Sequence, residues 1–314
     1  MVIDILLLIV GLALIVFGAD WLVDGASAVA RKAGISEFVI GLTIVGFGTS
    51  CPELVVSLTG AFQGNADIAI GNVVGSNIFN VLMILGITTL IAPVAMSRVN
   101  ARVDIPIALG VTVLFMALGL TGGGINRIEG LVMMLVFAAY IYYCFKFDKS
   151  AEDAGGAEES QKKVRSVWFA VLLIAAGLAG LIAGGQLFVG HATNIARAVG
   201  VSDKVIALTL LAGGTSLPEL ATCIAAAAKH KDQLALGNIL GSNVFNILLI
   251  LGCSAVITPL STAAMTAADF GTLLLSILLL LVSAYSGHRD RVDRWEGVVM
   301  ILVYIAYMVL LFMK

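Results

Sequence analysis

Charged residues are scarce in this sequence. Asp, Glu, Lys and Arg make up 12% of its 314 residues, about half of their share in soluble domains. The net charge is −2 and no basic cluster is present, so the sequence lacks the electrostatic signature of a nucleic-acid-binding protein. A soluble protein of this length would carry many more charges, and the composition therefore excludes that class.

Cysteine and histidine are also rare. The three histidines are scattered, and the four cysteines have neither the spacing of a metal site nor that of a disulfide framework. We interpret Cys51, Cys144, Cys223 and Cys253 as buried free thiols, because each lies in an apolar segment. Without a cluster of soft ligands, the sequence does not predict a zinc or copper site.

Apolar residues, by contrast, make up 60% of the chain. They form ten runs near the length of about 20 residues that a helix needs to span a bilayer. The sequence therefore predicts an all-α polytopic membrane protein with ten transmembrane helices. The predicted spans are residues 3–30, 36–62, 66–92, 102–121, 127–147, 166–196, 202–228, 232–258, 268–286 and 295–313.

The distribution of Lys and Arg predicts the orientation of these spans. With the N-terminus outside, 14 of the 18 basic residues fall on the cytoplasmic side and four fall outside. This is the bias that the positive-inside rule describes. We therefore expect a multi-pass protein of the inner (plasma) membrane with both termini outside the cytoplasm. Residues 148–165 form the one polar connection, which we interpret as a flexible cytoplasmic linker.

The two halves of the chain repeat each other. Residues 39–86 align with residues 205–252 without a gap, and 23 of the 48 aligned positions are identical. We therefore divide the chain into a first five-helix repeat (1–147), the linker and a second five-helix repeat (166–314). Because five is odd, the second repeat enters the membrane from the opposite side. Inverted repeats of this kind are typical of secondary transporters.

Each repeat carries the motif Gly-Thr-Ser-x-Pro-Glu, at residues 48–53 and 214–219. Proline lacks an N–H and crowds the preceding turn, so each motif predicts a break, in the second and the seventh helix. Glu53 and Glu219 are ionisable groups inside predicted spans, where such groups usually mark a site or a pathway. Thr and Ser four and three residues before each Glu add oxygens on the same face. These residues are Thr49, Ser50, Thr215 and Ser216.

A second motif, Gly-Asn-x-x-Gly-Ser-Asn-x-x-Asn, follows at residues 71–80 and 237–246. Its residues at a spacing of four form one polar stripe on a helix. We expect the deeper members of the stripe to be ligands, namely Ser76, Asn80, Ser242 and Asn246. For Asn72, Asn77, Asn238 and Asn243, two interpretations stay open, ligation and hydrogen bonding between helices.

These groups predict a site for hard cations. Two carboxylates offer four oxygens, the Thr49 and Thr215 carbonyls add two, and Ca²⁺ takes about 6–8 oxygen ligands. Two glutamates also neutralise one Ca²⁺, while hydroxyls and amides are neutral ligands suited to Na⁺. The other acids inside a span, Asp20 and Asp24, have Gln186 and Gly190 at the matching positions. We expect them to form ion pairs or to line a wet vestibule.

The paired motifs resemble the alpha repeats of the sodium/calcium exchanger family, of prokaryotic type, within the cation/calcium antiporter superfamily. The resemblance covers the ten-helix length and implies eight core helices around four ion sites. It also implies that two long tilted helices, here the first and sixth, slide to alternate access. The implied calcium ligands are Glu53, Glu219, Thr49 and Thr215. The implied sodium ligands are Ser50, Ser76, Asn80, Ser216, Ser242, Asn246 and the carbonyls of Gly46 and Ala212.

Two departures from relatives bear on the coupling ion. Asn246 stands where some prokaryotic and all potassium-dependent animal exchangers carry Asp, which argues against a potassium requirement and leaves either an ion or a water at the central position. Gly75 and Gly241 stand where proton-coupled relatives carry Glu, which favours sodium. The large regulatory insert of animal exchangers is absent.

The leading hypothesis is antiport of Na⁺ against Ca²⁺ by alternating access. A H⁺/Ca²⁺ or other divalent-cation antiporter is the alternative. A cation channel with Glu53 and Glu219 as a selectivity ring fits less well, because pores usually surround an axis normal to the membrane. We expect no enzymatic activity, no cofactor and no obligatory protein partner; the substrates would be Ca²⁺ and Na⁺, and the surroundings a lipid bilayer.

Overall fold

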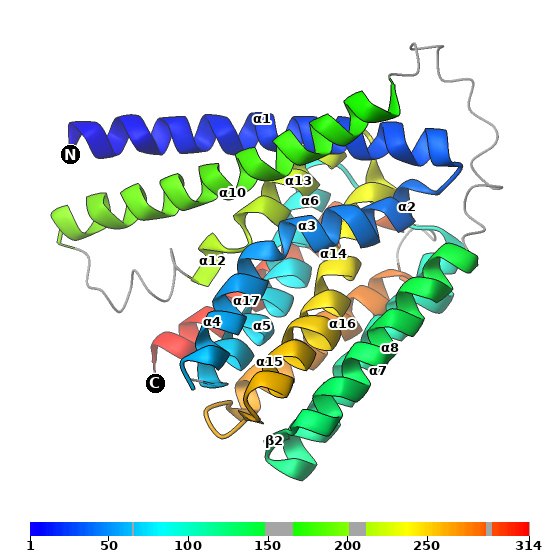
Figure 1. Cartoon of the computed structure of the whole chain (residues 1–314), viewed down its shortest axis with the longest axis vertical. Helices are drawn as coiled ribbons and strands as arrows, with labels where there is room; N and C mark the ends of the chain where they lie inside the picture. Colours follow the sequence, from blue (N-terminus) through cyan, green and yellow to red (C-terminus); the bar gives the residue numbers. More distant parts are fainter. Residues whose placement is uncertain (65, 148–165, 201–211, 287–290, 314) are drawn as a thin grey trace.

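The structure is a computed structural model, and it describes residues 1–64, 66–147, 166–200, 212–286 and 291–313. Apart from loops and four two-residue strands, the described chain is helical, in agreement with the predicted class (Figure 1). The first half contains α1 (Val2–Ala33), α2 (Glu37–Ile40), η1 (Gly41–Val45), α3 (Gly46–Thr49), α4 (Cys51–Phe62), α5 (Ala66–Phe79), η2 (Asn80–Leu85), α6 (Gly86–Ile91), β1 (Val94–Ala95), η3 (Asn100–Asp104), α7 (Ile105–Gly122), β2 (Gly124–Ile125) and α8 (Arg127–Lys146). The second half contains α10 (Val167–Ala198), α12 (Ala212–Gly214), α13 (Leu217–Ala228), α14 (Asp232–Phe245), η5 (Asn246–Leu251), α15 (Gly252–Ile257), β3 (Leu260–Ser261), α16 (Ala267–Ser283), β4 (Arg291–Val292) and α17 (Arg294–Phe312). The η elements are π-helical turns.

Among the described residues, seven helices are long and apolar enough to cross a membrane, and a bent pair, Glu37–Thr49 with Cys51–Phe62, makes an eighth if it counts as one span. Two shorter apolar helices, α13 and α16, overlap the predicted spans 202–228 and 268–286. The start of span 202–228 and the linker at 148–165 lie outside the described residues. The count of ten therefore stays a prediction.

Helices α1 and α10, each 32 residues long, lie side by side along the top of Figure 1. Glycines bring their backbones into contact. A Cβ atom at Gly18 would lie 2.8 Å from the carbonyl oxygen of Gly177, and one at Gly177 would lie 2.7 Å from that of Gly18. Small residues allow such close approach in membranes, so the two long helices form one tightly packed pair.

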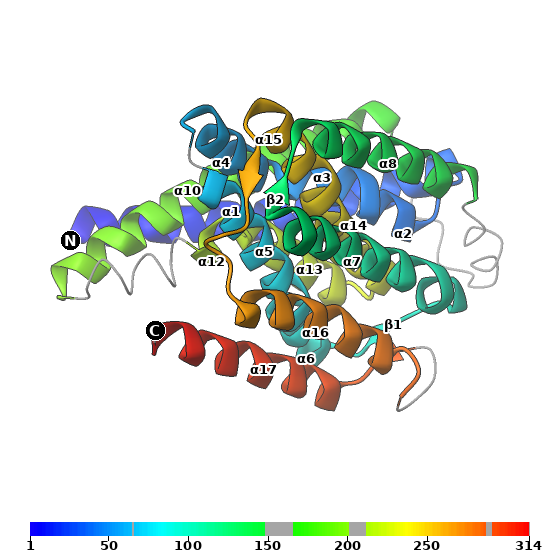
Figure 2. The same cartoon turned by 90° about the horizontal axis from the view of Figure 1, so that it is seen from below.

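The helices that carry the second motif are the most enclosed. Of the apolar window in each span, 67% is buried in Asp67–Ile91 and 83% in Asp232–Ile257, against 22% in α1, α8, α10 and α17. Figure 2 shows α5 in the middle of the bundle, with α16 and α17 to one side. The polar stripes are therefore placed in the interior, while the exposed apolar side chains of the outer helices face the surroundings.

The two halves are fastened to each other at both ends of the bundle. Strand β1 pairs with β4, and β2 pairs with β3. The guanidinium of Arg127 donates to the carbonyl oxygen of Ile257 at 3.4 Å, and Arg294 donates to that of Ile91 at the same distance. These short strands are the departure from an all-helical chain; they satisfy backbone groups where loops of opposite halves meet.

The four cysteines are free, as predicted, but only Cys144 and Cys223 are buried. Cys51 and Cys253 are partly exposed, which corrects the prediction for these two. Cys51 lines an apolar cavity of about 470 Å³ between α3, α8, α10 and α14. A cysteine in an apolar segment is therefore not always buried in this protein.

Candidate functional site

The second predicted span is broken at the first motif. Ser50 leaves the helical conformation, with φ −82° and ψ 7°, and the helix bends by 47° there. Pro52 and Glu53 lie in the first turn of α4, where a proline needs no helical hydrogen bond and a carboxylate is favoured by the helix dipole. The predicted break of the second helix is confirmed.

The second motif copy has the same local structure. Ser216 follows α12 with φ −90° and ψ 9°, and α13 begins directly after it. Pro218 and Glu219 lie in the first turn of α13. The break at this motif is therefore present, although residues 201–211 lie outside the described residues.

The two motifs exchange hydrogen bonds. The Ser216 hydroxyl donates to Oε1 of Glu53 at 2.9 Å, and the Ser50 hydroxyl donates to Oε1 of Glu219 at 2.9 Å. Ser76 of α5 also donates to Oε1 of Glu53, at 3.4 Å. Both glutamates are 1% exposed. Five of the predicted ligands are thus brought to one buried place, and each carboxylate is held by the serine of the other half.

Several buried oxygen atoms of the predicted ligands lack a hydrogen-bond partner among the described residues. They are Oε2 of Glu53, Oε2 of Glu219, and the amide oxygens of Asn80 and Asn246. The buried hydroxyl of Thr215 is also unpartnered. Neither glutamate is ion-paired with a basic side chain in the described ranges. Each unsatisfied buried acceptor costs about 1–3 kcal/mol, a cost that bound cations would offset.

Three further predicted residues lie around the first break. The Ser242 hydroxyl donates to the carbonyl oxygen of Gly46 at 3.4 Å, so these two are brought together. The buried Thr49 hydroxyl donates to Oδ1 of Asn238 at 3.1 Å, which leaves its carbonyl as the candidate ligand. Ala212 begins α12, and its side-chain surroundings are outside the described part of the structure.

Hydrogen bonding between helices accounts for two of the asparagines left open above. Asn72 donates to the carbonyl oxygen of Glu53 at 3.1 Å and to the Ser57 hydroxyl at 3.0 Å. Asn238 accepts from Thr49 and donates to the sulfur of Cys223 at 3.4 Å. Both amides therefore form hydrogen bonds that stabilise the broken helices.

The remaining asparagines form a network between the two central helices. Asn80 donates to Oδ1 of Asn243 at 3.0 Å, and Asn246 donates to Oδ1 of Asn77 at 3.0 Å. Asn80 and Asn246 each begin a π-helical turn, η2 and η5. Such turns are frequent at functional sites. The sequence pattern marked these residues but did not predict the turns, since periodicity does not separate one π turn from an α-helix.

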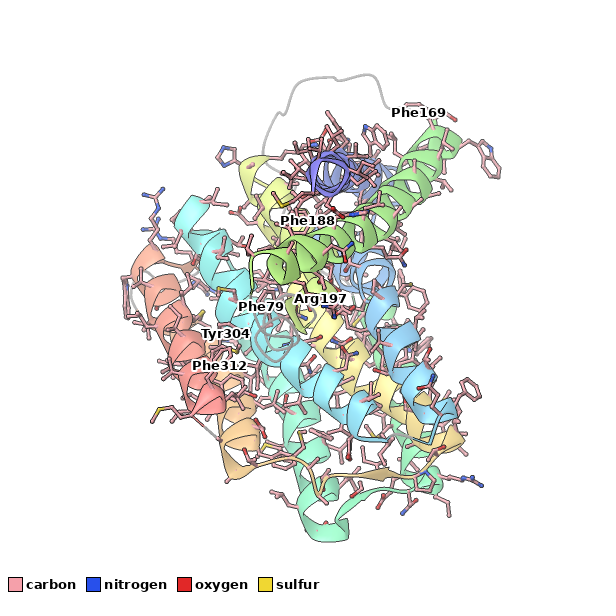
Figure 3. The ribbon with its side chains drawn as sticks, turned by 90° about the vertical axis from the view of Figure 1, so that its left-hand side faces the viewer. Phe79, Phe169, Phe188, Arg197, Tyr304 and Phe312 are labelled. Carbon is pink, nitrogen blue, oxygen red and sulfur yellow. The ribbon has the colours of Figure 1, made fainter. Side chains whose placement is uncertain are left out.

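The ring of Phe79, next to Asn80, packs against α17. Its centroid lies 5.5 Å from that of Tyr304 in an edge-to-face contact, which Figure 3 shows between α5 and α17. A Cβ atom at Gly213 would lie 3.9 Å from the same ring. Phe79 therefore contacts both the outer helix α17 and the broken segment of the second half.

The acids on the first helix are ion-paired, one of the two expected outcomes. Lys229, which follows α13, bonds to the Asp20 carboxylate and lies 2.7 Å from Oδ1 of Asp24. Its ammonium also donates to the Asp20 carbonyl oxygen at 3.1 Å. These side chains are partly exposed, so they tie α1 to the end of α13 without belonging to the buried site.

The ligand chemistry of the site suits hard cations. Among the described residues, no group of three His, Cys, Asp or Glu side chains lies together. The site instead combines two carboxylates with hydroxyl, amide and carbonyl oxygens. This is the donor set of calcium and the alkali cations rather than of zinc or copper.

Comparison with known proteins gave one family. The model of the sodium/calcium exchanger protein family matches residues 3–146 and 169–313. The putative antiporter CaxA of Alkalimonas amylolytica is 39% identical, with 99% of both chains covered. The sodium/calcium exchanger MaX1 of Methanosarcina acetivorans is 34% identical, again with 99% of both chains covered. A solved structure of the sodium-calcium exchanger NCX_Mj, soaked with zero Na⁺ and Ca²⁺, superposes with a TM-score of 0.86 at 32% identity, covering 98% of this chain and 99% of that one.

Proposed function

The chain belongs to the sodium/calcium exchanger family, and from that premise we propose that it exchanges Na⁺ for Ca²⁺ across the inner (plasma) membrane by alternating access. Because it is a multi-span member of a transporter family, we expect its ligands to be ions that it transports rather than the substrate of a reaction. Calcium and sodium would therefore be its cargo.

One observation carries the proposal. Two carboxylates from opposite halves lie at one buried place, and each has one oxygen without a hydrogen-bond partner in the described chain. Together they supply two negative charges, which neutralise one Ca²⁺. We assign the calcium ligands to Glu53, Glu219 and the backbone carbonyls of Thr49 and Thr215.

Neutral oxygens around this pair are suited to Na⁺. The sodium ligands in the proposal are Ser50, Ser76, Asn80, Ser216, Ser242, Asn246 and the carbonyls of Gly46 and Ala212. The unpartnered amide oxygens of Asn80 and Asn246 and the Ser242–Gly46 contact support this assignment. Because Ser50 and Ser216 also bond the glutamates, sodium and calcium would compete for shared side chains, as antiport requires.

Alternating access is proposed to use the inverted repeat of residues 1–147 and 166–314. Strand β1 pairs with β4 and β2 pairs with β3, so each strand of the first half pairs with a strand of the second half. This arrangement supports two equivalent halves of opposite direction. The glycine-packed pair α1 and α10 would slide as one body against the other helices. The termini would lie outside the cytoplasm, with residues 148–165 inside, following the distribution of basic residues.

The test is transport by the purified protein in proteoliposomes. Vesicles loaded with Na⁺ should take up radioactive calcium when diluted into sodium-free medium, and vesicles with only a pH gradient should not. Glu53→Gln and Glu219→Gln should each abolish uptake, since each removes one of the two charges that neutralise calcium. Normal uptake by either variant would refute the assigned site.

A H⁺/Ca²⁺ antiporter is the second candidate. The same unpartnered carboxylate oxygens accept a proton as well as a cation, and this observation favours proton coupling as the alternative. Calcium uptake driven by a pH gradient alone would establish it. Uptake without any counter-gradient would instead indicate a channel.

A further inference from the structure

We propose that Asn77 and Asn243 are positioning residues that turn the amide oxygens of Asn246 and Asn80 toward the transported cation. The inference rests on the proposed function, because it concerns the same ion site. An asparagine side chain has one oxygen, which binds a cation, and one NH₂ group, which repels it. An asparagine is therefore a cation ligand only if something determines which end faces the ion.

The four asparagines form two short chains of hydrogen bonds, which we call the relay. The first half of the relay starts at a group that can only accept a hydrogen bond. Nδ2 of Asn77 lies 3.1 Å from the backbone carbonyl oxygen of Asn243. A carbonyl oxygen has no hydrogen to donate, so this contact requires the NH₂ end of Asn77 to face it. The Asn77 oxygen then faces the other way and accepts from Nδ2 of Asn246 at 3.0 Å. With its NH₂ group so engaged, Asn246 presents its oxygen to the site.

The second half of the relay repeats the arrangement in the opposite direction. Nδ2 of Asn243 lies 3.4 Å from the backbone carbonyl oxygen of Asn77, and Oδ1 of Asn243 accepts from Nδ2 of Asn80 at 3.0 Å. Of the polar atoms of these four side chains, the oxygens of Asn80 and Asn246 are the two left without a partner in the described chain. All four side chains are buried, so water does not compete for these bonds.

A reversed amide would be penalised twice. If Asn246 turned over, its oxygen would face the oxygen of Asn77, and its NH₂ group would take the place of the oxygen proposed to bind the cation. Asn77 could not turn to compensate, because its own oxygen would then face the carbonyl oxygen of Asn243. The pair of backbone carbonyls thus determines the orientation of both ligand amides through one intermediate residue each.

The relay matters because both proposed amide ligands, at positions 80 and 246, are asparagines. A carboxylate would present an oxygen in either orientation, so an aspartate at position 246 would not depend on Asn77. It would also have no hydrogen to donate to the Asn77 oxygen. This difference separates a positioning role from ordinary packing and provides the experiment.

The experiment measures the sodium concentration at which the rate of calcium transport in proteoliposomes reaches half of its maximum. Four proteins are compared: the natural sequence, Asn77→Ala, Asn246→Asp, and the double variant. We expect Asn77→Ala to raise that concentration at least about fivefold in the natural background, as for a buried amide that loses its partner. In the Asn246→Asp background the same change should not raise it, because there the Asn77 oxygen receives no hydrogen bond and faces a carboxylate oxygen instead.

Asn72→Ala is the matched control, because Asn72 is on the same helix and bonds the Glu53 backbone rather than a ligand amide. Its effect should be the same with Asn246 or with Asp at position 246. Thermal unfolding of each variant monitors folding. If Asn77→Ala does not fold, Asn243→Ala with and without Asn80→Asp tests the other half of the relay.

An equal effect of Asn77→Ala in both backgrounds, or no effect in either, would overturn the positioning role while leaving sodium–calcium exchange intact. Absence of sodium-driven calcium transport by the natural protein would overturn the proposed function, and the relay with it. The two failures are therefore distinguishable in one set of measurements.

Discussion

Ser50 donates its hydroxyl hydrogen to Glu219 across the interface between the two halves, at 2.9 Å and over 169 positions of sequence. The matching bond, from Ser216 to Glu53, has the same length and spans 163 positions. Each half therefore orients the carboxylate of the other. The residue types were evident from the motifs, but this exchange is a property of the assembled bundle.

We expect Ser50→Ala and Ser216→Ala to weaken ion binding by similar amounts. A hydrogen bond to a charged group contributes about 1.5–3 kcal/mol, so the half-saturating calcium concentration should rise by about tenfold or more. Initial rates of calcium uptake measure this. Ser276→Ala is the control, since Ser276 is buried but bonds only within its own helix, to Leu273. A much larger effect of one motif serine than of the other would contradict the equivalence of the halves.

Removal of the ions should destabilise the protein. A ligand that binds only the folded state stabilises it by about 2.7 kcal/mol at a concentration one hundred times its dissociation constant. Calcium should therefore raise the thermal unfolding temperature, a chelator should reverse the rise, and Glu53→Gln should remove it. Magnesium is a suitable comparison, because it requires a smaller octahedral site and gives up its water reluctantly. Equal stabilisation by both ions would be evidence against a selective calcium site.

Gly18→Ala should disturb the packing of α1 on α10. The added Cβ would lie 2.8 Å from a backbone oxygen of Gly177, and overpacking of this kind costs about 1–3 kcal/mol. The expected result is a lower unfolding temperature. Gly185→Ala on α10 is the matched control, because nothing lies within 4 Å of its Cβ position. If both variants unfolded at the same temperature, the close contact of the two helices would not contribute to stability.

Lys229→Gln should change transport more than stability. Partly exposed ion pairs contribute about 0–1 kcal/mol, so the unfolding temperature should hardly move. The ion pairs to Asp20 and Asp24 tie α1 to α13, and sliding of α1 would have to break them in each cycle, so their loss should raise the maximal exchange rate. Lys231→Gln is the control, since Lys231 is a nearby lysine that pairs with Glu37 of α2, at 3.0 Å. An unchanged rate for Lys229→Gln would show that this tie does not limit the cycle.

Much of the fold followed from local chemistry. The predicted span 232–258 corresponds to the continuous helix Asp232–Ile257, and the predicted break at Pro52 corresponds to the 47° bend. Apolar length and the missing proline N–H act within a few residues, so a single sequence reveals them. The pairing of Asp20 and Asp24 was one of two expectations, because their partner, Lys229, lies in the other half of the chain.

By itself, the sequence determined that this is a helical membrane protein with a repeated, proline-broken carboxylate motif and a repeated asparagine stripe. Hydropathy, helix breaking and periodicity depend on neighbours along the chain, which is why they could be predicted. Only the tertiary structure decided which serine holds which glutamate, and that Asn77 and Asn243 hold the amides of Asn246 and Asn80. Those contacts join segments more than 160 residues apart, and they exist only where the two halves pack against each other.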